Sequence, residues 1–176
     1  MESRAKLFGH SIHQMLIVFP LGLLITSVVF DVIYLVTGNG AWAGIAYWMI
    51  IAGLIGGLLA AIFGVIDWTA IPAGTRAKAI GVYHAVLNVG VMVLFFISWF
   101  LRQENPQQIG KIPILLSFLA VGIGSVAAWF GGELVSRLGV GVDDGAHLNS
   151  PNSMSGHPAY EQVPEPGVAD NRTRAA

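Results

Sequence analysis

Residues 41–66 read AWAGIAYWMIIAGLIGGLLAAIFGVI, a run of 26 residues without one charged side chain. At about 1.5 Å per residue, a helix of this length exceeds the roughly 30 Å hydrocarbon core of a bilayer. Inside hydrocarbon every backbone N–H and C=O must pair within the protein, and a helix achieves this within a single segment. The run has no polar face with which it could lie on the surface of a soluble bundle. The stretch therefore predicts a transmembrane helix.

Three further apolar stretches of at least twenty residues accompany this one. Turn and loop residues such as Thr37-Gly38-Asn39-Gly40 separate them, so neighbouring spans run antiparallel. We expect an all-α fold, an integral membrane four-helix bundle, within a transmembrane domain over residues 1–141. A disordered polar tail is expected over 142–176. The four predicted spans cover roughly residues 14–36, 41–66, 79–101 and 112–135.

The overall composition excludes several classes of protein. The 176 residues are 55% hydrophobic and 11% charged, with a net charge of −1, whereas an average soluble domain is roughly 25% charged. So few charges cannot cover a soluble globule, and binding to a phosphate backbone would need a basic excess, so we expect no nucleic-acid partner. The chain has no cysteine, which excludes disulfides, iron–sulfur clusters and thiol catalysis.

The first span raises the question of a secretory signal, because basic residues precede it. Its length, its Pro20 and Asp31, and the lack of an A-x-A cleavage pattern favour a span that is retained. Pro20 frees a backbone carbonyl and is expected to bend the helix. Asp31 lies five turns beyond His13 on the same stripe, near the opposite membrane surface.

The basic residues predict an orientation. Four spans place both termini and the loop at 68–77 on one side of the membrane. That side carries Arg4, Lys6, Arg76, Lys78, Arg137, Arg172 and Arg174, and the other side carries only Arg102 and Lys111. Because positive charge is retained on the cytoplasmic side, both termini are expected in the cytoplasm.

Small residues recur at every fourth position in the second and fourth spans, where they allow close helix packing. The expected packing residues are Gly56, Ala60 and Gly64, and Gly124, Ala128 and Gly132. The two halves also share a short segment, AAIFG at 60–64 and AAWFG at 127–131. A duplicated helical hairpin, related by a pseudo-twofold axis along the membrane normal, would explain this likeness. Chance similarity is the alternative.

Ionisable side chains gather at one end of the predicted spans. His10 and His13 open the first span, Asp67 closes the second, His84 opens the third, and Glu133 closes the fourth. Such groups are costly in membranes and usually face protein or water. A helix N-terminus disfavours imidazolium, and neutral imidazole is the form that binds metals.

Besides a proton relay through Asp67, a histidine and Asn88, three interpretations of this cluster remain open. The first is a divalent metal site formed by His10, His13 and His84 with Asp67 or Glu133. The second is a b-type haem with His84 and His13 as axial ligands and His10 as the substitute ligand. Cations near the haem propionates would then be Arg76, Lys78 or Arg137. The third is a set of interfacial residues that cap and join helices without any cofactor.

Several motifs in order resemble a known bacterial family, domain of unknown function 2231, over roughly residues 8–142. The resemblance implies a four-helix membrane domain of the bacterial inner membrane with no assigned activity. The sequence departs from the family pattern at Gln14, where members often have proline, and at Ser136 and Leu138. The matching motifs are Gly9-His10-x-x-His13, Phe19-Pro20, Asp67-Trp68, Ile71-Pro72-x-Gly74-Thr75, Gly81-x-x-His84-x-x-x-Asn88 and Gly131-Gly132-Glu133-Leu134.

These observations predict a multi-pass inner-membrane protein with a redox- or metal-linked role and a polar site at the cytoplasmic helix ends. We expect an electron-transfer component, not a complete enzyme, that contacts the lipid bilayer and a membrane redox partner or a second copy of itself. One alternative is a cofactor-free structural or partner-binding membrane subunit. A further alternative is a proton-coupled carrier, although no ionisable group lies near mid-bilayer in the predicted spans.

Overall fold

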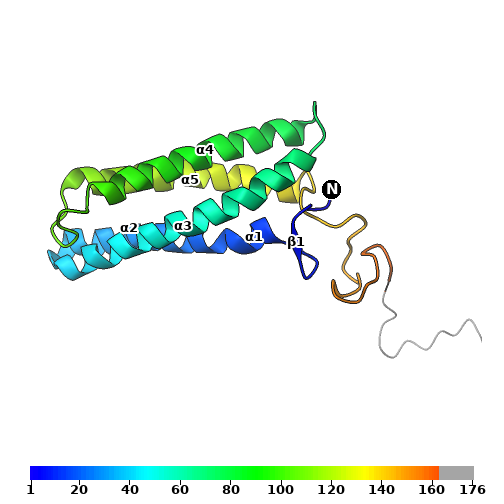
Figure 1. The fold of residues 1–176 in the computed structure, drawn as a ribbon, viewed down its shortest axis with the longest axis horizontal. Helices are drawn as coiled ribbons and strands as arrows, with labels where there is room; N and C mark the ends of the chain where they lie inside the picture. Colours follow the sequence, from blue (N-terminus) through cyan, green and yellow to red (C-terminus); the bar gives the residue numbers. More distant parts are fainter. Residues whose placement is uncertain (163–176) are drawn as a thin grey trace, which may run out of the picture.

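The computed structural model describes residues 1–162, which form five α-helices and one short antiparallel strand pair (Figure 1). The helices are long, apolar and packed side by side, so the predicted all-α four-span bundle is confirmed. The elements are β1 (Lys6–Leu7), β2 (His10–Ser11), α1 (Ile12–Leu16), α2 (Val18–Thr37), α3 (Gly40–Ala70), α4 (Arg76–Phe100) and α5 (Lys111–Ser136).

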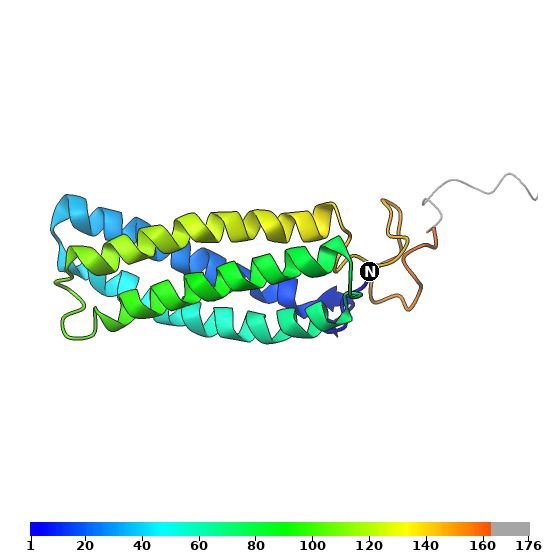
Figure 2. The same ribbon diagram turned by 90° about the horizontal axis from the view of Figure 1, so that it is seen from above.

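The bundle consists of two helical hairpins. The first hairpin pairs α1 and α2 with α3, and the second pairs α4 with α5. The two hairpins lie side by side (Figure 2), and the contacts between them are far less extensive than the contacts within each hairpin. One end of the bundle, called here the termini end, carries the N-terminal segment, the α3–α4 loop and the end of α5 (Figure 1). The far end carries the α2–α3 turn and the α4–α5 loop.

The first span is interrupted between α1 and α2, which together cover Ile12–Thr37. Pro20 has no N–H to donate to the carbonyl of Leu16, the residue at which α1 ends. The interruption therefore falls one turn before the proline, where the sequence predicts a freed carbonyl.

Capping residues set the other helix boundaries. Gly38 ends α2 with a left-handed φ of 66°, and the side chain of Asn39 accepts a hydrogen bond from the first turn of α3. The hydroxyl of Thr75 accepts from Lys78 N and starts α4 three residues earlier than the predicted span. As a result, His84 lies eight residues inside α4 and does not open it.

The core is thin and the outside of the bundle is apolar. Seven buried residues, including Leu24, Ile50 and Phe95, fill the interior between the hairpins. Many larger side chains point outward instead, among them Leu58, Val86 and Leu115. A soluble bundle does not present an outer surface of this kind, whereas one surrounded by lipid tails does.

The polar segment after α5 continues past the end of the bundle. Residues 143–162 contain turns but neither helix nor strand. They lie beside the N-terminal segment at the termini end (Figure 1). The remainder of the predicted tail, with Arg172 and Arg174, lies outside the described residues.

Candidate functional site

Two histidines from different helical hairpins meet inside the bundle. His13 lies on α1 and His84 on α4. Their ring centroids are 6.4 Å apart, and the ring planes are nearly perpendicular at 85°. Of the three predicted ligand histidines, these are the two that the fold brings together.

Each hairpin holds its histidine in the same way. His13 Nδ1 lies 2.8 Å from the carbonyl oxygen of Ala60, and His84 Nδ1 lies 2.9 Å from that of Ala127. A carbonyl only accepts hydrogen bonds, so Nδ1 carries the proton in both rings. In a neutral imidazole the lone pair is then on Nε2, the nitrogen that faces away from the carbonyl.

Glycines make room for both rings. A Cβ atom at Gly64 would lie 2.9 Å from ring atoms of His13, and one at Gly131 would lie 3.1 Å from the ring of His84. Real Cβ atoms avoid the distance at Gly64, so that position requires glycine while the ring stays in place. At Gly131 the contact is tight, and the ring of His84 would have to shift by a few tenths of an ångström. In each AAxFG segment, the first alanine binds the histidine through its carbonyl and the glycine makes room for the ring. The two similar segments therefore hold their histidines in the same way.

The two Nε2 atoms differ in their surroundings. Asn88 Nδ2 lies 3.2 Å from His84 Nε2 and also donates to the backbone carbonyl of His84 at 2.8 Å. No residue within 1–162 forms a hydrogen bond with His13 Nε2. The pair therefore offers one acceptor nitrogen without a partner and one that an amide engages.

The pair lies deeper than the sequence predicts. Ala60 and Ala127 precede the ends of α3 and α5 by ten and nine residues, which corresponds to about 14–15 Å along a helix. His13 opens the first span as expected, because it is the second residue of α1, whereas His84 lies eight residues inside α4. Relative to the ends of α3 and α5, the pair lies two to three turns inside the bundle. The reason is that the N-terminal segment folds back over the termini end and the caps lengthen α3 and α4.

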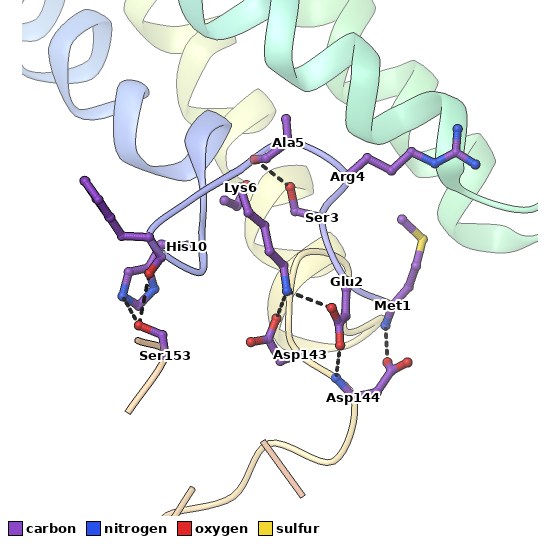
Figure 3. A network of polar contacts seen from close by, with 12 residues as sticks. Met1, Glu2, Ser3, Arg4, Ala5, Lys6, His10, Asp143, Asp144 and Ser153 are labelled. Carbon is purple, nitrogen blue, oxygen red and sulfur yellow. Dashed lines mark hydrogen bonds and ion pairs between the residues drawn. The ribbon is translucent and has the colours of Figure 1, made fainter. Parts of the chain in front are cut away.

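His10 is separated from the other two histidines. It lies on β2 and not on a helix, is exposed, and its Nε2 is 3.4 Å from Ser153 Oγ in the tail (Figure 3). The expected helical spacing between His10 and His13 is wrong because the β-turn before α1 directs the chain away from the bundle axis.

Asp67 holds the N-terminal segment. Its carboxylate accepts hydrogen bonds from Ser3 Oγ at 2.7 and 2.8 Å and from the backbone N–H of Arg4 at 2.8 Å. Ala5 N and Ser11 Oγ donate to it at 3.2 and 3.3 Å. Both carboxylate oxygens are therefore occupied, and Asp67 is not directed at the histidines.

The remaining predicted residues lie at the surface of the termini end. Glu133 forms a 2.6 Å ion pair with Arg76, which joins α5 to α4, and Arg137 is exposed just beyond α5. Within residues 1–162 no group of three His, Asp or Glu side chains converges as a metal site would require. The larger predicted ligand set with Asp67 and Glu133 is thus not assembled, because each carboxylate is engaged elsewhere.

The comparisons with known proteins place the chain in a family. The family model described as "Predicted membrane protein (DUF2231)" matches residues 9–144. The chain belongs to this family. The DUF2231 match covers the whole helical bundle, and four helices long and apolar enough to cross a bilayer make it a multi-pass membrane protein in contact with lipid. No curated protein and no solved structure matches the chain.

This DUF2231 protein has a buried ion pair at the far end that was not predicted from the sequence. Arg102 Nη1 and Nη2 each donate to one carboxylate oxygen of Asp31 at 2.7 Å, and both side chains are 0% exposed. The hydroxyls of Ser98 and Ser117 complete the cluster at 3.1–3.2 Å from the guanidinium. Asp31 lies near the far end of α2, and Arg102 lies just after α4 at the same end. Two opposite charges at the same depth in the bundle could have predicted this ion pair.

Small residues pack helices in both halves of the DUF2231 bundle, but only in part at the expected positions. In α3, Gly56 lies against Phe19 and Pro20, and Ala60 is buried. In α5, Ala128 is exposed, and a Cβ on Gly132 would meet open space. Four residues turn a helix by about 400°, so a ladder of spacing four drifts off the packing face by some 40° per step. In α5, the small residues that pack against α4 are instead Ala127, which is buried, and Gly131, which lies against His84.

Proposed function

We propose that this protein is a redox- or metal-linked component of the bacterial inner membrane in which His13 and His84 hold a b-type haem or a metal ion between the two helical hairpins. The observation that supports this proposal is the convergence of two imidazoles from separate hairpins, 6.4 Å apart, each with Nδ1 tied to a backbone carbonyl. This tie is the contact that metal-ligating histidines usually make through their other nitrogen, because it fixes tautomer and ring orientation.

The separation of the rings fits ligation by both. With an N–metal distance of about 2 Å and about 1.1 Å from each ring centre to Nε2, two imidazoles on one metal have ring centres about 5 to 6.3 Å apart, depending on the angle between them. The observed 6.4 Å lies at the upper end of this range. A protein-held ion such as zinc needs three or four protein ligands, whereas a b-type haem needs only one or two axial ligands. Two histidines without a third ligand nearby therefore favour the haem over a bare ion.

The chain would contribute position and exclusion of water. When bound, a haem supplies one-electron transfer. His13 offers a free Nε2, and His84 does so once the amide of Asn88 turns toward the backbone carbonyl that it already contacts. The limited contact between the hairpins lets them separate around a flat ligand. Arg137, exposed beyond α5, is the cation available to propionates at the termini end, whereas Arg76 would first have to leave its ion pair with Glu133.

The absorption spectrum of the detergent-purified protein tests the proposal. A Soret band with sharp α and β bands after reduction is expected in the wild type. The bands should be lost in His13→Ala and His84→Ala. His10→Ala is the matched control, because His10 is exposed on β2, and it should keep the spectrum. A colourless wild-type protein with no metal by elemental analysis refutes the proposal.

A cofactor-free structural membrane subunit is the second candidate, and the surroundings of His84 favour it. Asn88 already donates toward His84 Nε2, so ring, amide and carbonyls form a closed set of contacts that joins α4 to α5. In addition, two open surface hollows lie at the far end, around Trp48 and Phe118, away from the histidines. The same spectrum separates the two candidates.

The orientation and partner belong to the same proposal. We place both termini in the cytoplasm, since the termini end carries Arg4, Lys6, Arg76, Lys78 and Arg137, whereas Arg102 at the far end is neutralised by Asp31. Electrons would pass to a membrane redox partner or a second copy of the chain. Because the chain lacks cysteine, thiol labelling of intact cells with Gln107→Cys or Leu148→Cys tests the orientation. We expect a membrane-impermeant reagent to label position 107 and not position 148. Labelling of position 148 alone would show the opposite orientation.

A further inference from the structure

The turn between β1 and β2 carries an unfavourable residue. Leu7 pairs with His10, so Phe8 and Gly9 form a two-residue turn, with φ of 51° and 83°. Both values are left-handed, as a type I′ turn requires, and the first position normally holds Asn, Asp or Gly. A bulky aromatic side chain in this conformation is strained. Phe8 is the one residue other than glycine with positive φ in the described part of the chain.

The strained side chain makes little contact with the protein. Phe8 is 67% exposed and Leu7 is 45% exposed. The tail is hydrogen-bonded to the backbone of the turn, where Ser153 Oγ donates to the carbonyl oxygen of Phe8 at 3.1 Å. The conformational cost of Phe8 is therefore not offset by burial of its ring within residues 1–162.

The turn lies at the depth of the bilayer surface. Ser11, at the end of β2, contacts the carboxylate of Asp67, so the strand pair is level with the last turns of α3. Trp68 follows there, with Lys78 Nζ 3.7 Å from its ring centroid. Tryptophan and lysine at helix ends mark the headgroup region, where a ring can be in lipid while its polar group meets water.

The turn also points away from the bundle. The strand pair lies beyond the end of α1 and projects to the side of the helices (Figure 1). On α1 and α2, the exposed side chains of Met15, Val18 and Phe19 continue the apolar surface toward the middle of the membrane. The tip is thus continuous with the surface that contacts lipid.

We infer that the Leu7–Phe8 tip is an interfacial anchor, inserted between the headgroups and acyl chains of the leaflet at the termini end. The occupant of this surface is lipid, because the tip shares the depth of Trp68 and continues the lipid-facing side of α1. Burial of the aromatic ring in the bilayer offsets the strain of the turn. The anchor in turn holds the strand pair against Asp67 and fixes the start of α1, on which His13 lies.

Depth-dependent quenching tests the anchor in the full chain. The cysteine-free background allows Phe8→Cys to carry a single environment-sensitive fluorophore in nanodiscs of phosphatidylcholine and phosphatidylglycerol. Phe19→Cys is the control in the spanning region, and Leu148→Cys is the control for an exposed apolar residue of the tail. We expect quenching by lipids with a doxyl group near the headgroup to be at least threefold stronger at position 8 than at 148, and quenching by aqueous iodide to be weaker.

Two outcomes overturn the inference. Iodide quenching at position 8 equal to that at 148 would place the tip in water. Protection from both quenchers would place it against protein, either a second copy or another chain.

A second variant separates the role of Phe8 from that of the label. Phe8→Asn introduces the residue that the turn favours, so the fold is expected to persist, as circular dichroism would show. With the fluorophore on Leu7→Cys, iodide quenching should rise at least twofold when Phe8 is replaced. An unchanged Leu7 signal would show that Phe8 does not hold the tip in the bilayer.

Discussion

The ion pair between Asp31 and Arg102 joins the two helical hairpins at the far end, and its loss should destabilise the whole bundle. Asp31 comes from α2 and Arg102 follows α4, with two N–O distances of 2.7 Å and no exposure of either side chain. Asp31→Asn removes the negative charge and leaves the guanidinium buried and unpaired. Breaking a buried pair in this way costs about 3–5 kcal/mol.

The neighbouring hydroxyls reduce this cost without removing it. Ser98 and Ser117 remain within 3.2 Å of the guanidinium, and each is a neutral acceptor worth about 1 kcal/mol or less. We therefore expect the lower part of the range, about 3 kcal/mol, which is a change of roughly a hundredfold in the unfolding equilibrium. Because the hairpins share few other contacts, the loss should appear as separation of the hairpins before their own helices melt.

The matched control replaces both charges. Asp31→Leu combined with Arg102→Met leaves no buried charge, and apolar replacement of a buried pair is commonly neutral or stabilising. The assay is unfolding in mixed micelles with increasing SDS, followed by fluorescence of Trp99, which stacks on Tyr47 at 5.9 Å between the hairpins. The reasoning is refuted if Asp31→Asn costs under about 1 kcal/mol, the range of exposed pairs, or if the double variant is as unstable as the single one.

Three further changes test other contacts. Asp67→Asn should release the N-terminal segment, since one amide oxygen replaces two charged acceptors, at a cost of about 1.5–3 kcal/mol; faster proteolysis before α1 is the measurement. Gly64→Ala should displace a histidine ring and cost about 1–3 kcal/mol, whereas Gly132→Ala, whose Cβ meets open space, should be neutral in the same SDS titration. Burial alone lowers the pKa of Lys6, but hydrogen bonds to Asp143 and Glu2 and the charges of these carboxylates raise it above its ordinary value. This contact therefore stabilises the docked tail at lower pH and is lost above about pH 10.4, the ordinary lysine value, as hydrogen exchange of residues 143–162 would show.

Hydropathy alone predicted the spans, because each long apolar run has one structure available to it in lipid. The helix boundaries were harder to predict. The cap at Thr75 lengthens α4 by a turn, and this moves His84 from the predicted end of a helix into the bundle. An error of three residues in a helix boundary is small, yet it changes the distance of a candidate ligand from the helix end by about 5 Å.

The sequence indicated one equivalence between distant segments, but no hydrogen bond between distant polar residues. The AAxFG segments identified Ala60 and Ala127 as equivalent, and these are the residues whose carbonyls hold His13 and His84. Asp67 had no such pattern. Its partners Ser3, Arg4 and Ala5 come from a segment whose folding back depends on one tight turn.

The three polar clusters differ in what they leave unpaired. At the far end the guanidinium and carboxylate satisfy each other, and at the termini end Asp67 is saturated by the N-terminal segment. Between them, His13 Nε2 has no hydrogen-bond partner within residues 1–162. Only the Asp31–Arg102 cluster ties the two hairpins to each other, whereas the Asp67 cluster ties the N-terminal segment to α3 within the first hairpin. The free lone pair of His13 Nε2 lies where the hairpins meet, and the proposed cofactor would have to bind there.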